Sequence, residues 1–163
     1  MENKKPEEID ELFDQAQKMV GDEFLDRVKY FALSWLPAKK IVEEAIKKRF
    51  DVHESGEIIE LEKYCPWQEH LLELEAEFKD VNIKFIVHQG NNGEGYRVQG
   101  VPIHKGSFVC RKLLAKNWRG LTNVALINES GILGSIFVHA TGYIGGNRMR
   151  NKAIEMAVKS LED

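Results

Sequence analysis

The sequence predicts an α+β or α/β protein in which a helical arm, residues 1–50, precedes a small mixed β-sheet packed with helices, residues 51–163. Three observations predict this fold class. Apolar residues recur at helical spacing through residues 1–50. Beyond the turn signal at Ser55-Gly56, short apolar runs alternate with helical segments. The length of 163 residues corresponds to about one domain, since domains average roughly 150 residues.

The arm is expected to contain two helices. The first covers residues 7–33, and Pro37 fixes a backbone angle that suits the first turn of the second, which extends to about residue 49. One stripe of apolar side chains follows the first helix: Ile9, Leu12, Phe13, Ala16, Val20, Phe24, Val28 and Phe31.

The sheet is expected to have about four strands. Residues 57–61 form the first, and a helix over residues 66–78 leads to a hairpin of residues 83–88 and 96–101 around the glycine-rich segment 90–95. A short helix is expected over residues 122–128. Residues 135–140 lack alternation, which is typical of a strand buried on both faces. The chain then turns at residues 142–146 and closes with a helix over residues 148–161.

Charge and composition restrict the classes of function. The net charge of −3 gives no general attraction to nucleic acid, so an anion site must be local. No apolar run approaches the roughly 20 residues of a membrane span, so no membrane association is expected. The two cysteines have no metal-binding spacing, and unpaired thiols favour an intracellular protein. The N-terminus has no leader character, so no targeting signal is expected.

The strongest local signal for a binding site is the predicted strand, glycine-rich turn and helix at residues 135–150. Gly145 and Gly146 allow backbone amides to approach a ligand, and Asn147 is a good helix N-cap. Arg148 adds positive charge at a helix end that already attracts anions, and His139 precedes the turn. The pattern fits a phosphate cradle, and it fits equally well a tight turn beside solvated arginines.

Two further cations are candidates for the same site. Arg97 alternates with Tyr96 and Val98 on the predicted hairpin, so it either reaches across the sheet to a ligand or lies on the surface. Arg119 follows Trp118 in an irregular stretch, where binding residues tend to gather. Catalytic signals are weak, because no aspartate ends an apolar strand and no Asp-x-Asp, His-x-His or Walker motif is present. The sequence therefore predicts recognition without catalytic residues of its own.

Seven segments, in one order, resemble the C-terminal half of the melanocyte-proliferating-gene (Myg) family of the DHH phosphoesterase superfamily. They include Ile-Phe-Val-His-Ala-Thr-Gly-Tyr-Ile-Gly-Gly at residues 136–146, and the others lie at 24–28, 34–38, 55–58, 65–71, 96–102 and 118–121. The resemblance covers residues from about 10 to 161. Members of this family are often labelled metal-dependent protein hydrolases.

The resemblance implies a 3′-to-5′ exonuclease acting on RNA, found in the nucleus and mitochondria of eukaryotes. It implies a divalent metal, Mn²⁺ or Mg²⁺, held by an N-terminal catalytic domain that this sequence lacks, so no cofactor is expected in this chain. The C-terminal half is similar to the DHH-associated domain, whose Gly-Gly turn holds phosphate or a terminal nucleotide. On this sequence that role falls to Gly145, Gly146, Asn147 and Arg148, with His139 nearby. Many such domains have histidine where this chain has Asn147.

Two alternatives to a substrate-binding portion that takes single-stranded RNA or a nucleotide stay open. One is an assembly module without a ligand, in which the helix over residues 7–33 pairs with a partner domain or with a second copy in a homodimer. The other is a self-sufficient hydrolase with a site around His70 or His139.

Overall fold

The computed structural model describes residues 6–90 and 93–163, and it divides into two compact units, residues 1–37 and residues 38–163. The second unit begins at Ala38, and the division that the sequence predicts at residue 50 stays a prediction. Residues 1–5, where no leader is expected, lie outside the described residues, and so do two positions of the glycine-rich segment 90–95. No helix in the described ranges is long and apolar enough to cross a membrane.

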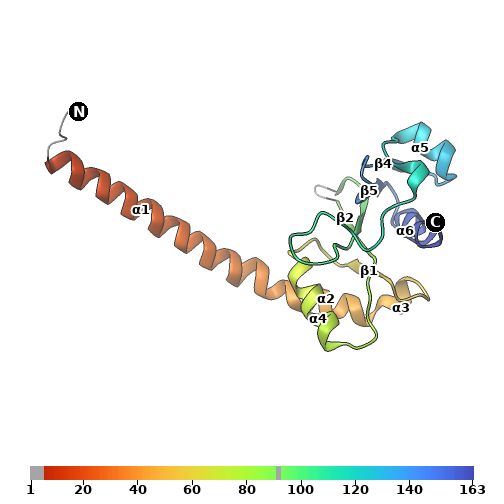
Figure 1. Ribbon diagram of the computed structural model, residues 1–163, viewed down its shortest axis with the longest axis horizontal. Coiled ribbons are helices and arrows are strands. Elements are labelled where there is room, and N and C mark those ends of the chain that lie inside the picture. The colour runs from red at the N-terminus through yellow and green to blue at the C-terminus, as the bar shows by residue number, and fades with distance from the viewer. Residues whose placement is uncertain (1–5, 91–92) are drawn as a thin grey trace. The chain divides into compact units, whose positions relative to one another are not determined.

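The first unit contains helix α1, Pro6–Tyr30, and a π-helical segment η1, Phe31–Trp35 (Figure 1). The backbone N–H of Leu36 donates to the carbonyl of Phe31, five residues earlier. Helix α2, Leu36–Lys47, has Pro37 in its first turn, as predicted. The apolar side chains of α1 and η1 are exposed: Ile9, Leu12, Phe13, Val20, Phe24, Val28 and Phe31.

The second unit is built on a five-stranded mixed sheet in the order β1-β2-β3-β5-β4. Its strands are β1 Ile58–Leu61, β2 Phe85–Gln89, β3 Tyr96–Gly100, β4 Ser135–Val138 and β5 Ile144–Asn147. β1 pairs with β2 in parallel, and the other neighbours pair antiparallel. The predicted mixed sheet and its hairpin are confirmed, with one more strand than expected. The remaining helices are α3 Arg49–Val52, α4 Gln68–Glu77, η3 Lys116–Trp118, α5 Asn123–Ser130 and α6 Arg150–Glu162.

The two faces of the sheet contribute to two separate apolar cores. Because side chains alternate along a strand, Ile58, Phe85 and Val98 point to one face, where they pack with Met156 and Ala157 of α6. Ile59 and Ile86 point to the other face, where they pack with residues of α2 and α4. α2 and α4 lie together in Figure 1, apart from α6. The α2/α4 core contains residues of β1 and β2, and none of its members belongs to β3, β4 or β5.

The glycine-rich segment near the C-terminus differs from its prediction. Gly145 and Gly146 belong to strand β5, and the turn comes earlier, at residues 139–143. Helix α6 begins at Arg150 rather than at residue 148. β4 is an edge strand with Ile136 and Phe137 partly exposed, and not a strand buried on both faces. Tight packing explains glycines inside a strand, because a Cβ on Gly145 would lie 2.7 Å from Cδ1 of Leu114.

Candidate functional site

Beyond the α2/α4 core, the same face of the sheet carries polar side chains in register, from β2 and β3. His88 of β2 lies opposite Arg97 of β3, and Arg97 lies opposite Gly146 of β5. Three adjoining depressions follow this face, and we call them together the sheet groove. The first is lined by Arg97 and Arg148, the second by Tyr64, His88, Arg97 and Gln99, and the third by Gln99, His139 and Tyr143. Arg97 lines both the first and the second depression, and Gln99 lines both the second and the third, so neighbouring depressions adjoin.

Arg97 is the central cation of the sheet groove. Its side chain is 19% exposed, so it is partly buried, unlike the surface arginine that the sequence left open as one alternative. Nη1 donates to the carbonyl oxygens of Glu94 at 3.0 Å and Tyr96 at 3.4 Å, and the guanidinium lies 5.6 Å from the ring centroid of Phe137. The carboxylate of Glu94 is 3.9 Å from Nη2 but 74% exposed, so it neutralises Arg97 only weakly. A guanidinium has five N–H donors, more than these contacts use.

Gly146 and Gly90 provide the space for this guanidinium. A Cβ on Gly146 would lie 3.2 Å from Nη1 of Arg97, and a Cβ on Gly90 would lie 3.3 Å from its Cζ. Gly146 therefore contributes to the groove because it has no side chain, which leaves room for the guanidinium of Arg97. Its neighbour Gly145 points to the opposite face, where its missing side chain makes room for Leu114.

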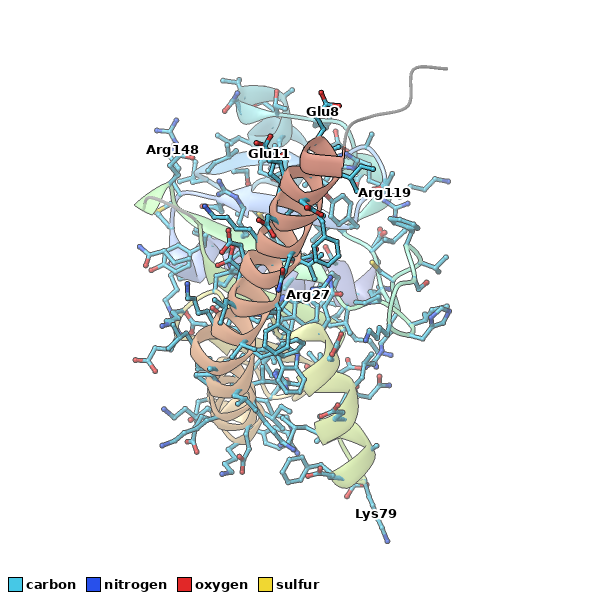
Figure 2. All side chains as sticks on the ribbon, turned by 90° about the vertical axis from the view of Figure 1, so that its left-hand side faces the viewer. Glu8, Glu11, Arg27, Lys79, Arg119 and Arg148 are labelled. Atoms are coloured by element: carbon cyan, nitrogen blue, oxygen red, sulfur yellow. The ribbon has the colours of Figure 1, made fainter. Side chains whose placement is uncertain are left out.

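Arg148 is the second cation of the groove. It is exposed, and it lines a depression of about 450 Å³ together with Gly95, Arg97 and Ile136. Figure 2 shows the labelled Arg148 side chain extending outward from its strand end. Arg150, two residues further along the chain, is held by Glu60 through two hydrogen bonds.

Asn147 is fully buried and faces the α6 core rather than the groove. Its Nδ2 donates to the carbonyl of Leu133 at 3.0 Å and to Oγ of Ser135 at 3.3 Å, and its Oδ1 accepts from the backbone N–H of Met149 at 2.9 Å. The helix N-cap is Met149, so the prediction of Asn147 as N-cap is wrong. The amide instead fixes the turn that leads from β5 into α6.

His139 lies at the other end of the groove from Arg148. It is exposed, and its ring stacks edge-on with Tyr143 at a centroid distance of 4.9 Å. The backbone N–H of Thr141 donates to Nδ1 at 3.2 Å, so Nδ1 is an acceptor and Nε2 carries the proton of the neutral ring. The third depression that His139 lines is about 580 Å³ in volume and also has Gln99 and Phe108 in its wall.

Arg119 is not part of the groove. Its Nε donates to the carbonyl of Leu114 at 2.9 Å, and a Cβ on Gly142 would lie 2.6 Å from that nitrogen. Gly142 itself has a φ of 77°, which a residue with a Cβ rarely adopts. Arg119 thus packs on the β4–β5 turn, and Figure 2 shows it well away from Arg148.

His88 and Tyr64 are groove residues that no sequence motif predicts. His88 is 6% exposed, and its ring centroid lies 4.8 Å from that of Tyr64. Burial lowers the pKa of His88 below its ordinary value, and the positive charge of Arg97 lowers it further, while the carbonyl of Gln89 opposes the shift. The ring is therefore neutral near pH 7. In the sequence, His88 is the last residue of a predicted apolar strand, residues 83–88, and no neighbouring motif marks it as a binding residue.

Metal ligands are not gathered anywhere in the described ranges. No group of three or more His, Cys, Asp or Glu side chains within residues 6–90 and 93–163 is placed to hold a metal ion. His70, one of the two residues around which a self-sufficient hydrolase site was considered, is fully buried on helix α4. The described residues of this chain thus do not fit the divalent metal that the resemblance implies.

Comparison with known proteins identifies one family. Residues 1–161 match the model of the MYG1 exonuclease family, described as Uncharacterised protein family (UPF0160). The chain is 49% identical over 151 residues to the MYG1 exonuclease of Bos taurus, covering 91% of this chain and 39% of that protein. It is 47% identical over 151 residues to the human MYG1 exonuclease, with coverages of 91% and 40%.

A third relative matches over a similar share of this chain. The MYG1 protein of Dictyostelium discoideum is 43% identical over 155 residues, which cover 94% of this chain and 46% of that protein. The chain therefore spans less than half the length of these curated relatives. No solved structure matches the chain.

Proposed function

Because the chain belongs to the MYG1 exonuclease family, we propose that it is the substrate-binding portion of a 3′-to-5′ RNA exonuclease. In this proposal the sheet groove binds single-stranded RNA or a terminal nucleotide, and Arg97 and Arg148 contact its phosphates. His139 contacts the strand at the far end of the groove. The location of the whole enzyme in the nucleus or mitochondria is part of the same proposal.

The observation that carries the proposal is the pair of arginines on an open sheet face. Arg97 and Arg148 line one depression, in a chain whose net charge is −3. An arginine binds phosphate through two parallel hydrogen bonds, and Arg97 is held in place by Gly146 and Phe137 before a ligand arrives. Such preorganisation lowers the entropy lost on binding. Tyr64 and Tyr143 along the groove supply rings on which bases stack.

Compared with the sequence-based hypothesis, the set of proposed contacts changes. Gly146 and Arg148 stay, Arg97 becomes the principal contact, and Gly145, Asn147 and Arg119 take supporting roles away from the ligand. Cleavage of the phosphodiester is proposed to need a divalent metal, Mn²⁺ or Mg²⁺, held by an N-terminal catalytic domain of the DHH type as a partner of this portion. The contribution of this chain is then to grip and orient the RNA strand.

The test is fluorescence anisotropy of a short labelled single-stranded RNA, titrated with the full chain without metal at low and moderate salt. Saturable binding that weakens with salt is expected, because phosphate contacts release counterions. Arg148→Ala should weaken binding about tenfold, the effect of one charge-assisted contact of 1–2 kcal/mol.

Lys79→Ala is the charge-matched control for this experiment. Lys79 is exposed beyond the end of α4 and lies far from Arg148 in Figure 2. An equal loss of affinity in both variants would mean that only overall charge matters. Absence of binding by the unaltered chain would contradict the proposal for this portion on its own.

One observation favours a second candidate function, assembly. Helix α1 exposes Phe13, Phe24 and Val28, which are 68%, 66% and 47% accessible. A contiguous apolar stripe of this kind is typical of a helix that packs on another surface. If copies of the chain pair through α1, Phe24→Glu should convert a dimer to a monomer in light scattering, without changing RNA binding. A chain that is monomeric at high concentration would contradict pairing between copies.

A further inference from the structure

His88 presents a buried hydrogen-bond acceptor to the sheet groove. Its Nδ1 lies 2.8 Å from the carbonyl oxygen of Gln89. A carbonyl only accepts, so Nδ1 must carry the proton and donate it. In the neutral ring Nε2 is then an acceptor, and it has no hydrogen-bond partner within the residues that the structure describes.

An unpaired buried acceptor is unusual. Most buried polar atoms have a partner, and an exception needs an explanation. His88 is 94% buried, since its exposed fraction is 6%, and it lines the same depression of about 400 Å³ as Arg97 and Gln99. Arg97 and Gln99 both carry N–H donors, but Nη1 of Arg97 donates to the carbonyl of Glu94 and not to His88. The acceptor is therefore available to a ligand that carries a donor.

The position of Arg97 restricts where on the ligand this donor lies. His88 and Arg97 are directly opposite on neighbouring antiparallel strands, and such side chains start about 5 Å apart. A phosphate held by Arg97 therefore puts its own nucleotide within reach of His88. The 2′-hydroxyl is only a few bonds from the 3′-phosphate, whereas the polar edge of a base lies beyond the sugar.

We propose that His88 recognises the ribose 2′-hydroxyl of the nucleotide whose phosphate is bound by Arg97, so that the groove distinguishes RNA from DNA. The hydroxyl donates to Nε2 of the neutral ring, and the ring of Tyr64 lies beside the imidazole at a centroid distance of 4.8 Å. A 2′-hydroxyl is the group by which a protein separates the two nucleic acids at a given position. This inference rests on the proposed function of the groove and adds its selectivity.

The test compares oligouridylate with oligodeoxyuridylate of the same length, which differ only at the 2′ position. Both are titrated into the full chain, the His88→Phe variant and the His88→Gln variant. Phe keeps a ring beside Tyr64 and removes the acceptor, whereas the Gln amide oxygen restores an acceptor near the position of Nε2. His104→Phe is the matched control, because His104 is exposed and bonds its own loop at the carbonyl of Lys105.

Oligouridylate is expected to bind the unaltered chain more tightly. His88→Phe should weaken that binding roughly five- to tenfold, the effect of one neutral hydrogen bond, and leave oligodeoxyuridylate binding unchanged. His88→Gln should recover part of the preference. Equal affinity of the unaltered chain for both strands, or an equal change in both on substitution, would overturn the role of His88 while the groove stands. Failure to bind either strand would overturn the proposed function and this inference together.

Discussion

The guanidinium of Arg97 lies over Gly146, with Nη1 3.2 Å from where a Cβ on that glycine would be. The two residues are partners in the β3–β5 register, so the relationship follows from strand pairing. A second neighbour, Phe137, would lie 3.0 Å from the same Cβ. The glycine therefore sets the position of the cation at the centre of the sheet groove.

Substitution of the two glycines of β5 should separate binding from stability. Gly146→Ala pushes on the ends of Arg97 and Phe137, which can move, so we expect RNA affinity to fall about fivefold, or about 1 kcal/mol. Gly145→Ala instead crowds the fully buried Leu114 at 2.7 Å, so the free energy of unfolding should fall by roughly 1–3 kcal/mol. Urea unfolding and RNA titration of both variants check this. If Gly146→Ala lost stability and Gly145→Ala lost RNA affinity, the assignment of the two glycines to opposite faces of the sheet would be wrong.

A partly buried ion pair is expected to stabilise the loop beside the third depression. Arg111 donates to both carboxylate oxygens of Glu75, at 2.8 and 2.7 Å, and the two side chains are 16% and 9% exposed. Glu75 Oε1 also accepts from the backbone N–H of Ile83 at 2.8 Å. Glu75→Gln should lower the free energy of unfolding by roughly 1.5–3 kcal/mol, because it leaves the partly buried Arg111 without a counter-charge.

Glu43→Gln provides the comparison for that pair in urea unfolding. Glu43 pairs with Lys47 one helical turn away at 2.8 Å, with side chains 36% and 51% exposed. Exposed pairs of this kind contribute about 0.5 kcal/mol or less. Similar losses in the two variants would contradict a special role for the Glu75–Arg111 pair.

Stability should depend on pH through His88. Burial and Arg97 lower its pKa in the folded chain below the ordinary value of 6.5. Below about that pH the unfolded chain takes up a proton that the folded chain does not, so the free energy of unfolding falls as the pH decreases. The fall ends once the folded pKa is passed. His88→Gln should show a weaker decrease between about pH 7 and pH 5 than the unaltered chain. Parallel curves would show that His88 binds protons equally in both states.

The fold could largely be predicted because periodicity and turn signals are local. The hairpin of β2 and β3 flanks a glycine-rich segment, and the helices follow their apolar spacing. The fifth strand was missed for a physical reason. Gly145-Gly146 has no side chains to show alternation, and the same dipeptide serves a turn or a crowded strand equally well. Which applies depends on Leu114 and Arg97, which are distant in sequence.

The candidate site was predicted only in part for the same reason. Arg148 lines the first depression, and its phosphate contact stays a prediction, whereas the side chain of Asn147 is hydrogen-bonded to Leu133, Ser135 and Met149 in the core. Burial of Arg97 and the unpaired Nε2 of His88 both arise from pairing across strands. A one-residue shift of register would send each side chain to the other face, and register is not visible in a single sequence.

The most direct test of the sheet groove as the RNA site compares Arg97→Ala with Arg119→Ala in a titration of labelled single-stranded RNA. Each substitution removes one positive charge, but Arg119 hydrogen-bonds the carbonyl of Leu114 outside the groove. Arg97→Ala should lose roughly 10- to 100-fold in affinity, the effect of a charge-assisted contact of about 1.5–3 kcal/mol, and Arg119→Ala should bind as the unaltered chain does. Unchanged binding by Arg97→Ala, or an equal loss in both variants, would contradict the assignment of the groove.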